Sequence, residues 1–289
     1  MSGQLPGRVR VRSRERDHAG PSRLSGHILD LRRIRAAADA DVGALVYASS
    51  VGAYAPGPKD TRVDESWPAT GIRSSFYSRH KAEVEDLLDE LEADAPELRV
   101  VRLRPALIFK GDAASEIRRL FAGPFLPGFV LHPRLVPFVP RIPGLRFQAV
   151  HSLDVGDAYR RAVVGDASGA FNLAADPVIG PRELAGILEA RTLPVPARLT
   201  RALTDLTWRL HLQPTPPGWL DLALGVPLMD SGRAHRELGW RPARTSTEAL
   251  AELLEGLRRG AGGPTPPLEP DAGGPARLGE VRTGVGEKR

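Results

Sequence analysis

A strand, a helix and a second strand in quick succession constrain the fold of this chain more than any other feature. Residues 44–48 form a short, almost wholly apolar run, which is typical of a parallel strand covered on both faces. Residues 76–93 carry apolar side chains at helical spacing, and residues 99–104 form the next buried strand, ended by Pro105. This order predicts a right-handed βαβ unit and an α/β fold with a parallel sheet.

The predicted helix holds two polar residues in line with its apolar stripe. Tyr77 and Lys81 lie four residues apart and continue the stripe toward Leu88, whereas the acidic residues, Glu85 among them, are expected on the solvent side. A lysine on the buried side requires a partner, and its charge is expected to lower the pKa of the phenol so that Tyr77 acts as general base and acid. The alternative is an ordinary amphipathic helix whose lysine reaches solvent.

Two serines follow the first predicted strand. Ser49 and Ser50 leave its carboxyl end, which is where open α/β sheets place their ligands. A hydroxyl there can donate a hydrogen bond to a substrate oxygen, although a simple strand-end turn also explains a serine pair. A hydrolase triad of Ser50, His80 and Asp64 is disfavoured, because no glycine precedes the serine to allow a strained nucleophile turn.

These motifs together resemble the NAD-dependent epimerase/dehydratase family, the extended short-chain dehydrogenases/reductases. The resemblance covers residues 44 to about 258 and is carried by the segments 45–54, Tyr77-x-x-x-Lys81, 100–105, 150–155, 171–174 and 238–242. It implies a Rossmann-like parallel sheet and an oxidoreductase that uses NAD or NADP.

The resemblance also implies roles for individual residues. The residue at the Ser50 position hydrogen-bonds the reacting oxygen, the Tyr77 position transfers the proton, and the Lys81 position holds the nicotinamide ribose while supporting the tyrosine. The implied cofactor-binding residues are Ala48, Ser49, Tyr77, Lys81 and Pro105, of which Pro105 lies against the nicotinamide. No metal site is predicted, since the seven histidines show no paired spacing.

The amino-terminal region departs from the family pattern. Members begin with a strand and a Gly-rich turn that cradles the pyrophosphate, but the glycines of residues 1–26 lie in an Arg-rich segment with no preceding strand. We therefore expect the first four strands to be missing or replaced, the strand at residues 44–48 to lie close to a sheet edge, and the cofactor to bind weakly. A catalytically silent family member, such as a binding or scaffold protein or the product of a decayed gene, is the alternative.

Composition divides the chain into a core and two tails. Residues 1–27 and 260–289 are rich in Gly, Pro and charge without an apolar period, so both are expected to be disordered. Residues 28–259 form the expected Rossmann-like core, in which residues 112–150 and 175–245 build a smaller, mostly helical substrate lobe.

Further elements are expected along the second half of the chain. The strands are predicted at residues 147–151 and 171–174, and the helices at 154–164 (opened by an Asp154 cap), 181–191, 198–211, 231–238 and 247–259. An irregular lobe or lid is expected at residues 123–147, which are rich in proline and large apolar groups.

The expected reaction is hydride exchange with a secondary alcohol or ketone, either as net oxidoreduction or within an epimerisation. Dehydratases of the family carry an Asp-Glu pair where this chain has Val51 and Gly52, so dehydration of a nucleotide sugar is not expected. The apolar residues of 121–147 favour a substrate with apolar bulk, and a sugar-like substrate stays open.

Charge and composition exclude other functions. The net charge of +5 resides in the first 35 residues, which carry nine Arg against three acidic residues, so the remaining chain is close to neutral and no nucleic-acid partner is expected. No apolar stretch is long enough to cross a membrane, and the absence of cysteine together with the lack of a signal-peptide pattern favours the cytoplasm. A homodimer is one assembly that the sequence leaves open.

Overall fold

The computed structural model describes residues 34, 36, 37, 40, 42–121, 136–210, 215–265 and 268 of the 289-residue chain. The expected tail at residues 1–27 and most of the tail at 260–289 lie outside the described residues. The same holds for most of residues 28–41, whose apolar spacing predicts a helix; within them Ile34 is described as a buried residue.

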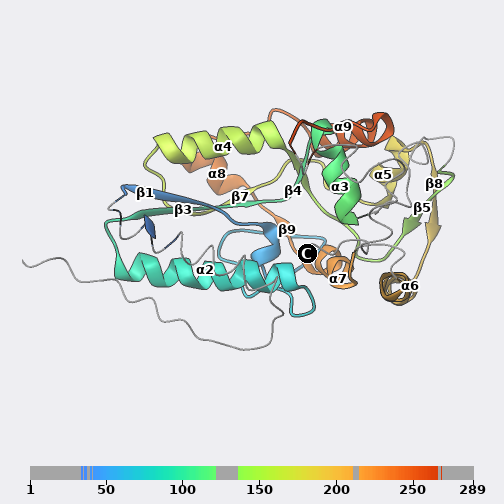
Figure 1. Cartoon of the computed structure of the whole chain (residues 1–289), viewed down its shortest axis with the longest axis horizontal. Helices are drawn as coiled ribbons and strands as arrows, with labels where there is room; N and C mark the ends of the chain where they lie inside the picture. The colour runs from blue at the N-terminus through green and yellow to red at the C-terminus, as the bar shows by residue number, and fades with distance from the viewer. Residues whose placement is uncertain are drawn as a thin grey trace, which may run out of the picture.

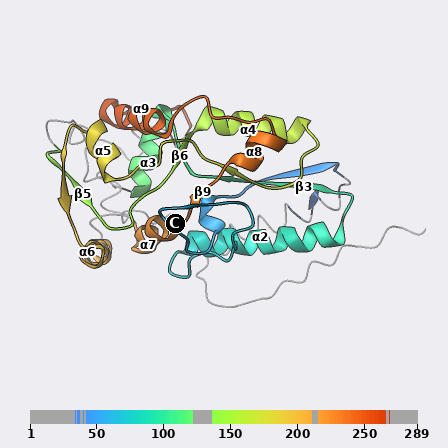
Figure 2. The same cartoon turned by 180° about the vertical axis from the view of Figure 1, so that it is seen from behind.

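A three-stranded parallel sheet forms the centre of the described fold. Its strands are β1 (Ala44–Ala48), β3 (Arg99–Pro105) and β7 (Gly169–Leu173), in the order β1–β3–β7. Helix α2 (Phe76–Asp94) covers one face, and α4 (Ser152–Val164) with α8 (Gly232–Glu237) covers the other (Figures 1 and 2). The predicted α/β architecture with a parallel sheet is therefore confirmed, and β1 lies at one end of the sheet that these residues form.

Alternation along β3 explains how the sheet joins its two helical layers. Val101 and Leu103 face the cluster built by α4, α8 and Trp240, whereas Val100 faces the cluster of α2 that includes Leu88. Successive side chains of a strand point to opposite faces, so each layer receives every second residue. The next two residues of β3 on the α2 side, Arg102 and Arg104, are charged, and they reappear below as part of the candidate site.

A second, mixed unit lies beyond the carboxyl ends of the sheet strands, at the right of Figure 1. It contains η2 (Gly111–Ala113), α3 (Ala114–Phe121), β5 (Phe138–Arg141), α5 (Pro181–Ile187), β8 (Arg191–Pro194), α6 (Ala197–Arg209), α7 (Gly218–Gly225) and α9 (Ser246–Arg259). Its core is formed by apolar side chains of α5, α9 and neighbouring strands. Within the region expected to be irregular, residues 138–141 form β5, which pairs in parallel with β8, while residues 122–135 lie outside the described part.

Short strands join the sheet to this second unit. Strand β4 (Leu107–Phe109) pairs with β6 (Ala149–His151), and β2 (Arg62–Val63) pairs with β9 (Leu228–Met229). The short helix η1 (Val51–Ala53) follows β1 directly.

Two expectations about the second half are wrong in detail. Helix α4 begins at Ser152 rather than at an Asp154 cap, because the His151 side chain accepts the Leu153 amide at 3.2 Å. Asp154 instead accepts the amides of Ala243 and Arg244 at 3.0 and 3.2 Å. The helix expected at residues 181–191 ends at Ile187, since the chain turns there into β8.

Candidate active site

The Tyr77 and Ser50 side chains meet at the carboxyl end of β1. Tyr77 lies in the first turn of α2, whose N-cap Ser75 accepts the Ser78 amide at 3.4 Å. Ser50 is the N-cap of η1 and accepts the Gly52 amide at 3.0 Å. Both side chains border Gly52, since a Cβ there would lie 3.4 Å from the Ser50 hydroxyl oxygen and 2.8 Å from Cε1 of Tyr77. The two side chains predicted as partners are thus neighbours.

Lys81 lies one helical turn after Tyr77 and faces the same strand end. Its Nζ donates to the Ala48 carbonyl at 2.7 Å and lies 3.4 Å from the Tyr47 hydroxyl. It also lies 5.9 Å from the ring centre of Tyr77. The structure therefore brings Ser50, Tyr77, Lys81 and Ala48 together, as their positions in the sequence predicted.

The pKa of Tyr77 differs from the sequence-based expectation. Burial raises the pKa of this phenol, and the hydrogen bond from Ser50 opposes that rise only in part. The expected lowering by Lys81 is wrong for this structure, because the ammonium group interacts with the Ala48 carbonyl and lies above the ring rather than at the phenolic oxygen. Burial therefore favours the protonated form of the Tyr77 phenol over the phenolate.

The backbone of η1 is fixed against α2 by a serine that the sequence did not single out. The buried Ser78 hydroxyl donates to the Gly52 carbonyl at 2.5 Å and accepts the Ile72 amide at 2.7 Å. A side chain at Gly52 would place its Cβ 2.8 Å from Cε1 of Tyr77. Only glycine allows this approach without displacing the ring.

Trp219 of α7 covers the other side of Tyr77. The two rings stack with centroids 5.2 Å apart and an interplanar angle of 26°. The backbone that carries Trp219 lies close to the start of α2, because a Cβ at Gly218 would lie 2.4 Å from the Ser74 carbonyl oxygen. Helix α7 thus holds an aromatic side chain against the candidate acid.

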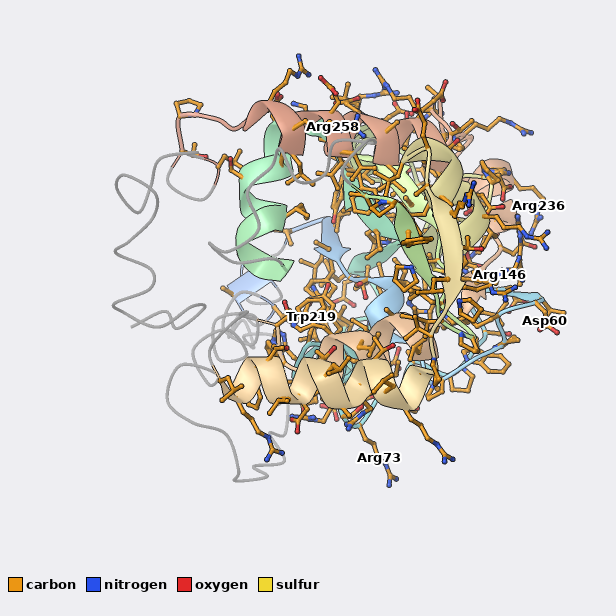
Figure 3. The ribbon with its side chains drawn as sticks, turned by 90° about the vertical axis from the view of Figure 1, so that its right-hand side faces the viewer. Asp60, Arg73, Arg146, Trp219, Arg236 and Arg258 are labelled. Carbon is orange, nitrogen blue, oxygen red and sulfur yellow. The ribbon has the colours of Figure 1, made fainter. Side chains whose placement is uncertain are left out.

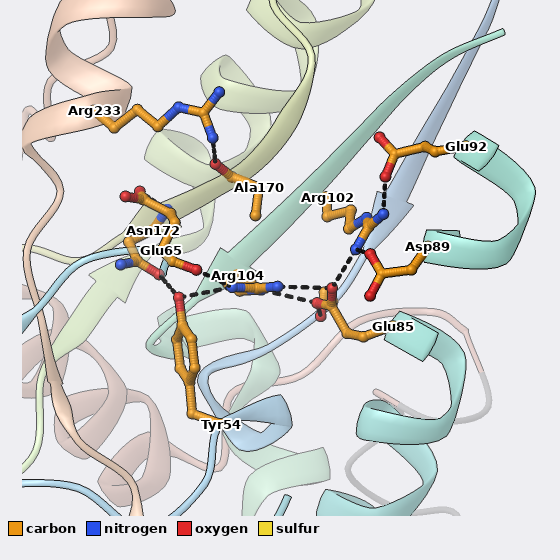
Figure 4. A network of polar contacts seen from close by, with 11 residues as sticks. Tyr54, Glu65, Glu85, Asp89, Glu92, Arg102, Arg104, Ala170, Asn172 and Arg233 are labelled. Atoms are coloured by element: carbon orange, nitrogen blue, oxygen red, sulfur yellow. Dashed lines mark hydrogen bonds and ion pairs between the residues drawn. The ribbon is translucent and has the colours of Figure 1, made fainter. Parts of the chain in front are cut away.

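A buried ionic network lies directly behind the site (Figure 4). Arg104 of β3 donates to Glu85 of α2 at 2.9 and 2.8 Å, and Ser49 donates to the same carboxylate at 2.5 Å. Arg102 reaches Glu85 at 3.3 Å and also pairs with acidic residues of the next turns of α2. Glu85 is 1% exposed, so its expected place on the solvent side of the helix is wrong.

The charge of Glu85 is maintained by its partners. Burial by itself would raise the pKa of this carboxyl group, but the hydrogen bonds and charge of Arg104, helped by Ser49 and Arg102, hold it below its ordinary value. Two guanidinium groups of β3 therefore face an ionised carboxylate across the interior.

The network continues to β7 through Tyr54. Arg104 donates to the Tyr54 hydroxyl at 3.0 Å, and that hydroxyl donates to Oδ1 of Asn172 at 2.7 Å. Burial raises the pKa of Tyr54 to about 12, although Arg104 opposes the rise. Glu65 accepts the Asn172 backbone amide at 2.8 Å, so the segment after β2 is tied to the sheet as well.

The remaining predicted cofactor-binding residues occupy different positions. Ser49 is buried and its hydroxyl donates to Glu85, so this side chain belongs to the ionic network and not to the cluster of Tyr77 and Lys81. Pro105 is the last residue of β3 and lies opposite Leu173 in the register with β7.

The sequence contained signals for three of the residues that were missed. Glu85 lies four residues after Lys81, and therefore on the same face of α2 as Tyr77 and Lys81. Arg102 and Arg104 alternate within a strand that was predicted to be buried, and buried arginines require acidic partners. Trp219 carried no comparable signal, because it lies 142 positions after Tyr77 in the sequence and no local pattern relates the two residues.

The residues that the structure describes lack two further features, a membrane-spanning helix and a metal-binding cluster. None of the described helices combines the length and apolarity that crossing a bilayer requires. Within the same residues, no three histidine or acidic side chains gather in a way that could hold a metal ion.

Comparison with known proteins yields relatives of low identity. No family model matches the chain. An uncharacterized protein of Mycobacterium tuberculosis, Rv2047c, is 28% identical over 257 residues, which cover 85% of this chain and 27% of that protein. The chain thus spans about a quarter of the length of this curated relative.

Solved structures are similar in fold. The UDP-glucose 4-epimerase of Thermus thermophilus, in complex with NAD, has a TM-score of 0.54 at 21% identity, over 79% of this chain and 68% of that one. The dTDP-glucose 4,6-dehydratase DesIV of Streptomyces venezuelae, with NAD bound, has a TM-score of 0.52 at 18% identity, over 84% and 71% of the two chains. The chain therefore has the Rossmann-like fold of the nucleotide-sugar epimerases and dehydratases, and the resemblance found in the sequence is confirmed at the level of fold.

Proposed function

We propose that this chain is a member of the NAD-dependent epimerase/dehydratase family that exchanges hydride with a secondary alcohol or ketone. One observation carries the proposal: the Ser50 and Tyr77 side chains both border Gly52 at the carboxyl end of β1, with Lys81 one turn along the same helix as Tyr77. A substrate oxygen placed between the two hydroxyls contacts a donor and an acid at once. Net oxidoreduction and epimerisation both use this arrangement.

The residues around Lys81 fit a nicotinamide nucleotide. An ammonium group and a phenol lie side by side at the carboxyl end of a parallel strand, and both suit the hydroxyls of a ribose. Lys81 and Tyr77 are proposed to bind the ribose, and Ala48, Ser49 and Pro105 to line the nicotinamide through backbone and ring atoms. NAD or NADP would supply the hydride acceptor or donor.

The chain's own residues perform the proton chemistry in this proposal. Tyr77, which burial keeps protonated, donates its proton to a substrate oxygen as negative charge develops there. Ser50 holds the same oxygen by a hydrogen bond, and its own position is fixed by the Gly52 amide. In the opposite direction a Tyr77 phenolate accepts the proton of an alcohol, and Lys81 stabilises that phenolate once its ammonium group, which here donates to the Ala48 carbonyl, turns toward the phenolic oxygen.

The test begins with cofactor binding. Purified protein is titrated with NADH and NADPH while the nicotinamide fluorescence is followed, and we expect weak but saturable binding that Lys81→Met lowers at least tenfold. Failure of both nucleotides to bind at millimolar concentration contradicts the proposal and leaves a catalytically silent binding or scaffold protein as the better account.

Activity is tested next on a panel of secondary alcohols and ketones, which includes nucleotide sugars. We expect Tyr77→Phe to abolish hydride exchange without changing the melting temperature, since the ring that stacks on Trp219 is retained. Tyr159→Phe is the matched control, because Tyr159 lies on α4 and packs with the cluster on the opposite face of the sheet.

A further inference from the structure

A cavity of about 520 Å³ lies between α6, α7 and the strand pair β5–β8. Its volume falls within the range of small-molecule sites. Trp219 lines this cavity, and the same indole stacks on Tyr77 (Figure 3 labels Trp219). The cavity therefore begins one aromatic ring away from the candidate acid.

The side chains that line the cavity are mostly apolar, whereas the phosphates of a nucleotide require hydrogen-bond donors or positive charge. Val195, Leu203, Leu220 and Trp219 contribute apolar surface, and no charged side chain is found among the described residues that line it. A diphosphate in this cavity would find no positive side chain among the described residues that line it, which disfavours its binding.

The threonines of α6 do not change this character. Thr200, Thr204 and Thr207 donate to carbonyls of the preceding turn, on Pro196, Thr200 and Leu203, at 3.2, 2.9 and 2.8 Å. Their hydroxyl protons are thus used within the helix, as is common for threonine in helices. A ligand in the cavity therefore contacts mainly methyl and methylene groups.

An ion pair joins the two helices that form the cavity. Arg201 of α6 donates to both carboxylate oxygens of Asp221 of α7, at 2.9 and 3.1 Å. A bidentate pair of this kind fixes relative orientation as well as distance. The ion pair therefore fixes helices α6 and α7, which both line the cavity, relative to each other.

We propose that this cavity binds the apolar part of the substrate, and that the substrate is a neutral ketone or secondary alcohol with a hydrocarbon tail or ring rather than a nucleotide sugar. The inference rests on the proposed function, since Tyr77 is taken as the acid. It names the substrate class from the chemistry of the cavity wall.

The test measures binding without turnover. A neutral fluorescent probe, 1-aminoanthracene, is bound to the full chain and displaced by 2-hexanone, 2-octanone and 2-decanone, with UDP as the polar competitor. We expect affinity to rise about fourfold per added methylene group, because each one leaves water for the apolar wall, and UDP to displace little probe. Affinity that does not depend on chain length, or displacement by UDP at lower concentration than by 2-decanone, overturns the inference.

Variants of α6 assign the binding to this cavity. Thr204→Arg places a charge in the wall and is expected to weaken 2-decanone binding more than tenfold. Ala202→Arg adds the same charge two residues away, on an exposed position that does not line the cavity, and is expected to leave binding unchanged. Thr204→Val, which keeps the shape and removes only a hydroxyl already used within the helix, is also expected to bind normally. Equal loss in both arginine variants, or no loss in Thr204→Arg, contradicts the assignment.

The two proposals fail separately. Chain-length-dependent binding without hydride exchange retains the cavity and refutes the oxidoreductase, whereas hydride exchange without binding of 1-aminoanthracene or the ketones refutes the cavity alone.

Discussion

Arg104 and Glu85 form a two-pronged hydrogen-bonded ion pair in the interior, 2.9 and 2.8 Å long, between the central strand of the sheet and the helix that carries Tyr77 and Lys81. Both side chains are nearly inaccessible, with exposed fractions of 5% and 2%. Because neither charge reaches water, each depends on the other for its solvation.

Glu85→Gln is expected to lower the free energy of unfolding by about 3–5 kcal/mol, because it leaves Arg104 buried without its counter-charge. Glu90→Gln is the matched control, since Glu90 lies on the exposed face of the same helix, and a change within about 0.5 kcal/mol is expected there. Urea unfolding followed by circular dichroism measures both. A similar small effect in the two variants would mean that the ion pair contributes little to stability.

The same carboxylate predicts how stability depends on pH. The pKa of Glu85 is lower in the folded protein than its ordinary value of 4.5, so the folded state binds fewer protons than the unfolded state in acid. Its contribution to stability is therefore complete above about pH 4.5 and is lost as the pH falls through that value toward the folded pKa. Urea unfolding between pH 6 and pH 3 should show a shallower loss in Glu85→Gln than in the unmodified protein.

Ser50→Ala is expected to reduce kcat by about 10²–10³, the usual effect of removing one donor to a developing oxyanion. Ser50→Thr keeps the hydroxyl, and with it both the proposed hydrogen bond to the substrate and the cap on the Gly52 amide, so it should restore most of the activity. Both variants are compared by initial rates on the substrate found in the panel. Equal losses in the alanine and threonine variants would point to a structural role alone.

Gly52→Ala tests whether Tyr77 must remain where it is. The new Cβ would lie 2.8 Å from Cε1 of Tyr77, so the ring must shift away from its place beside Ser50. We expect at least a tenfold loss of kcat. Gly156→Ala is the control: nothing lies within 4 Å of the added Cβ in α4, and the substitution should be neutral or stabilising by about 0.5–1 kcal/mol. Unchanged kcat in Gly52→Ala would contradict the role of Tyr77.

Local patterns in the sequence were sufficient to predict the sheet and the first cluster of the site. The apolar run at residues 44–48 matches β1, the strand predicted at 99–104 extends one residue to Pro105, and the helix predicted at 76–93 extends one residue to Asp94. Ser50, Tyr77 and Lys81 were found because a strand end and one helical turn place them together without any knowledge of distant contacts.

Features that depend on tertiary structure were not predicted. Glu85 was assigned to the solvent side because acidic residues flank it on α2, and only the arginines of β3 explain its burial. The pKa of Tyr77 was expected to fall, but the sequence could not give the degree of burial or the direction of the Lys81 side chain. The assignment of Ser50, Tyr77 and Lys81 to catalysis remains a prediction.

The two neighbours of Tyr77 come from different parts of the fold. Ser50 belongs to a backbone that Ser78 and the ionic network hold in the interior, so moving it would break several buried hydrogen bonds together. Trp219 is half-buried, stacks on Tyr77 from α7 and also lines the apolar cavity beside that helix. The ring at position 219 is therefore the boundary between the candidate acid and the cavity, and its size sets how closely a ligand in that cavity approaches Tyr77.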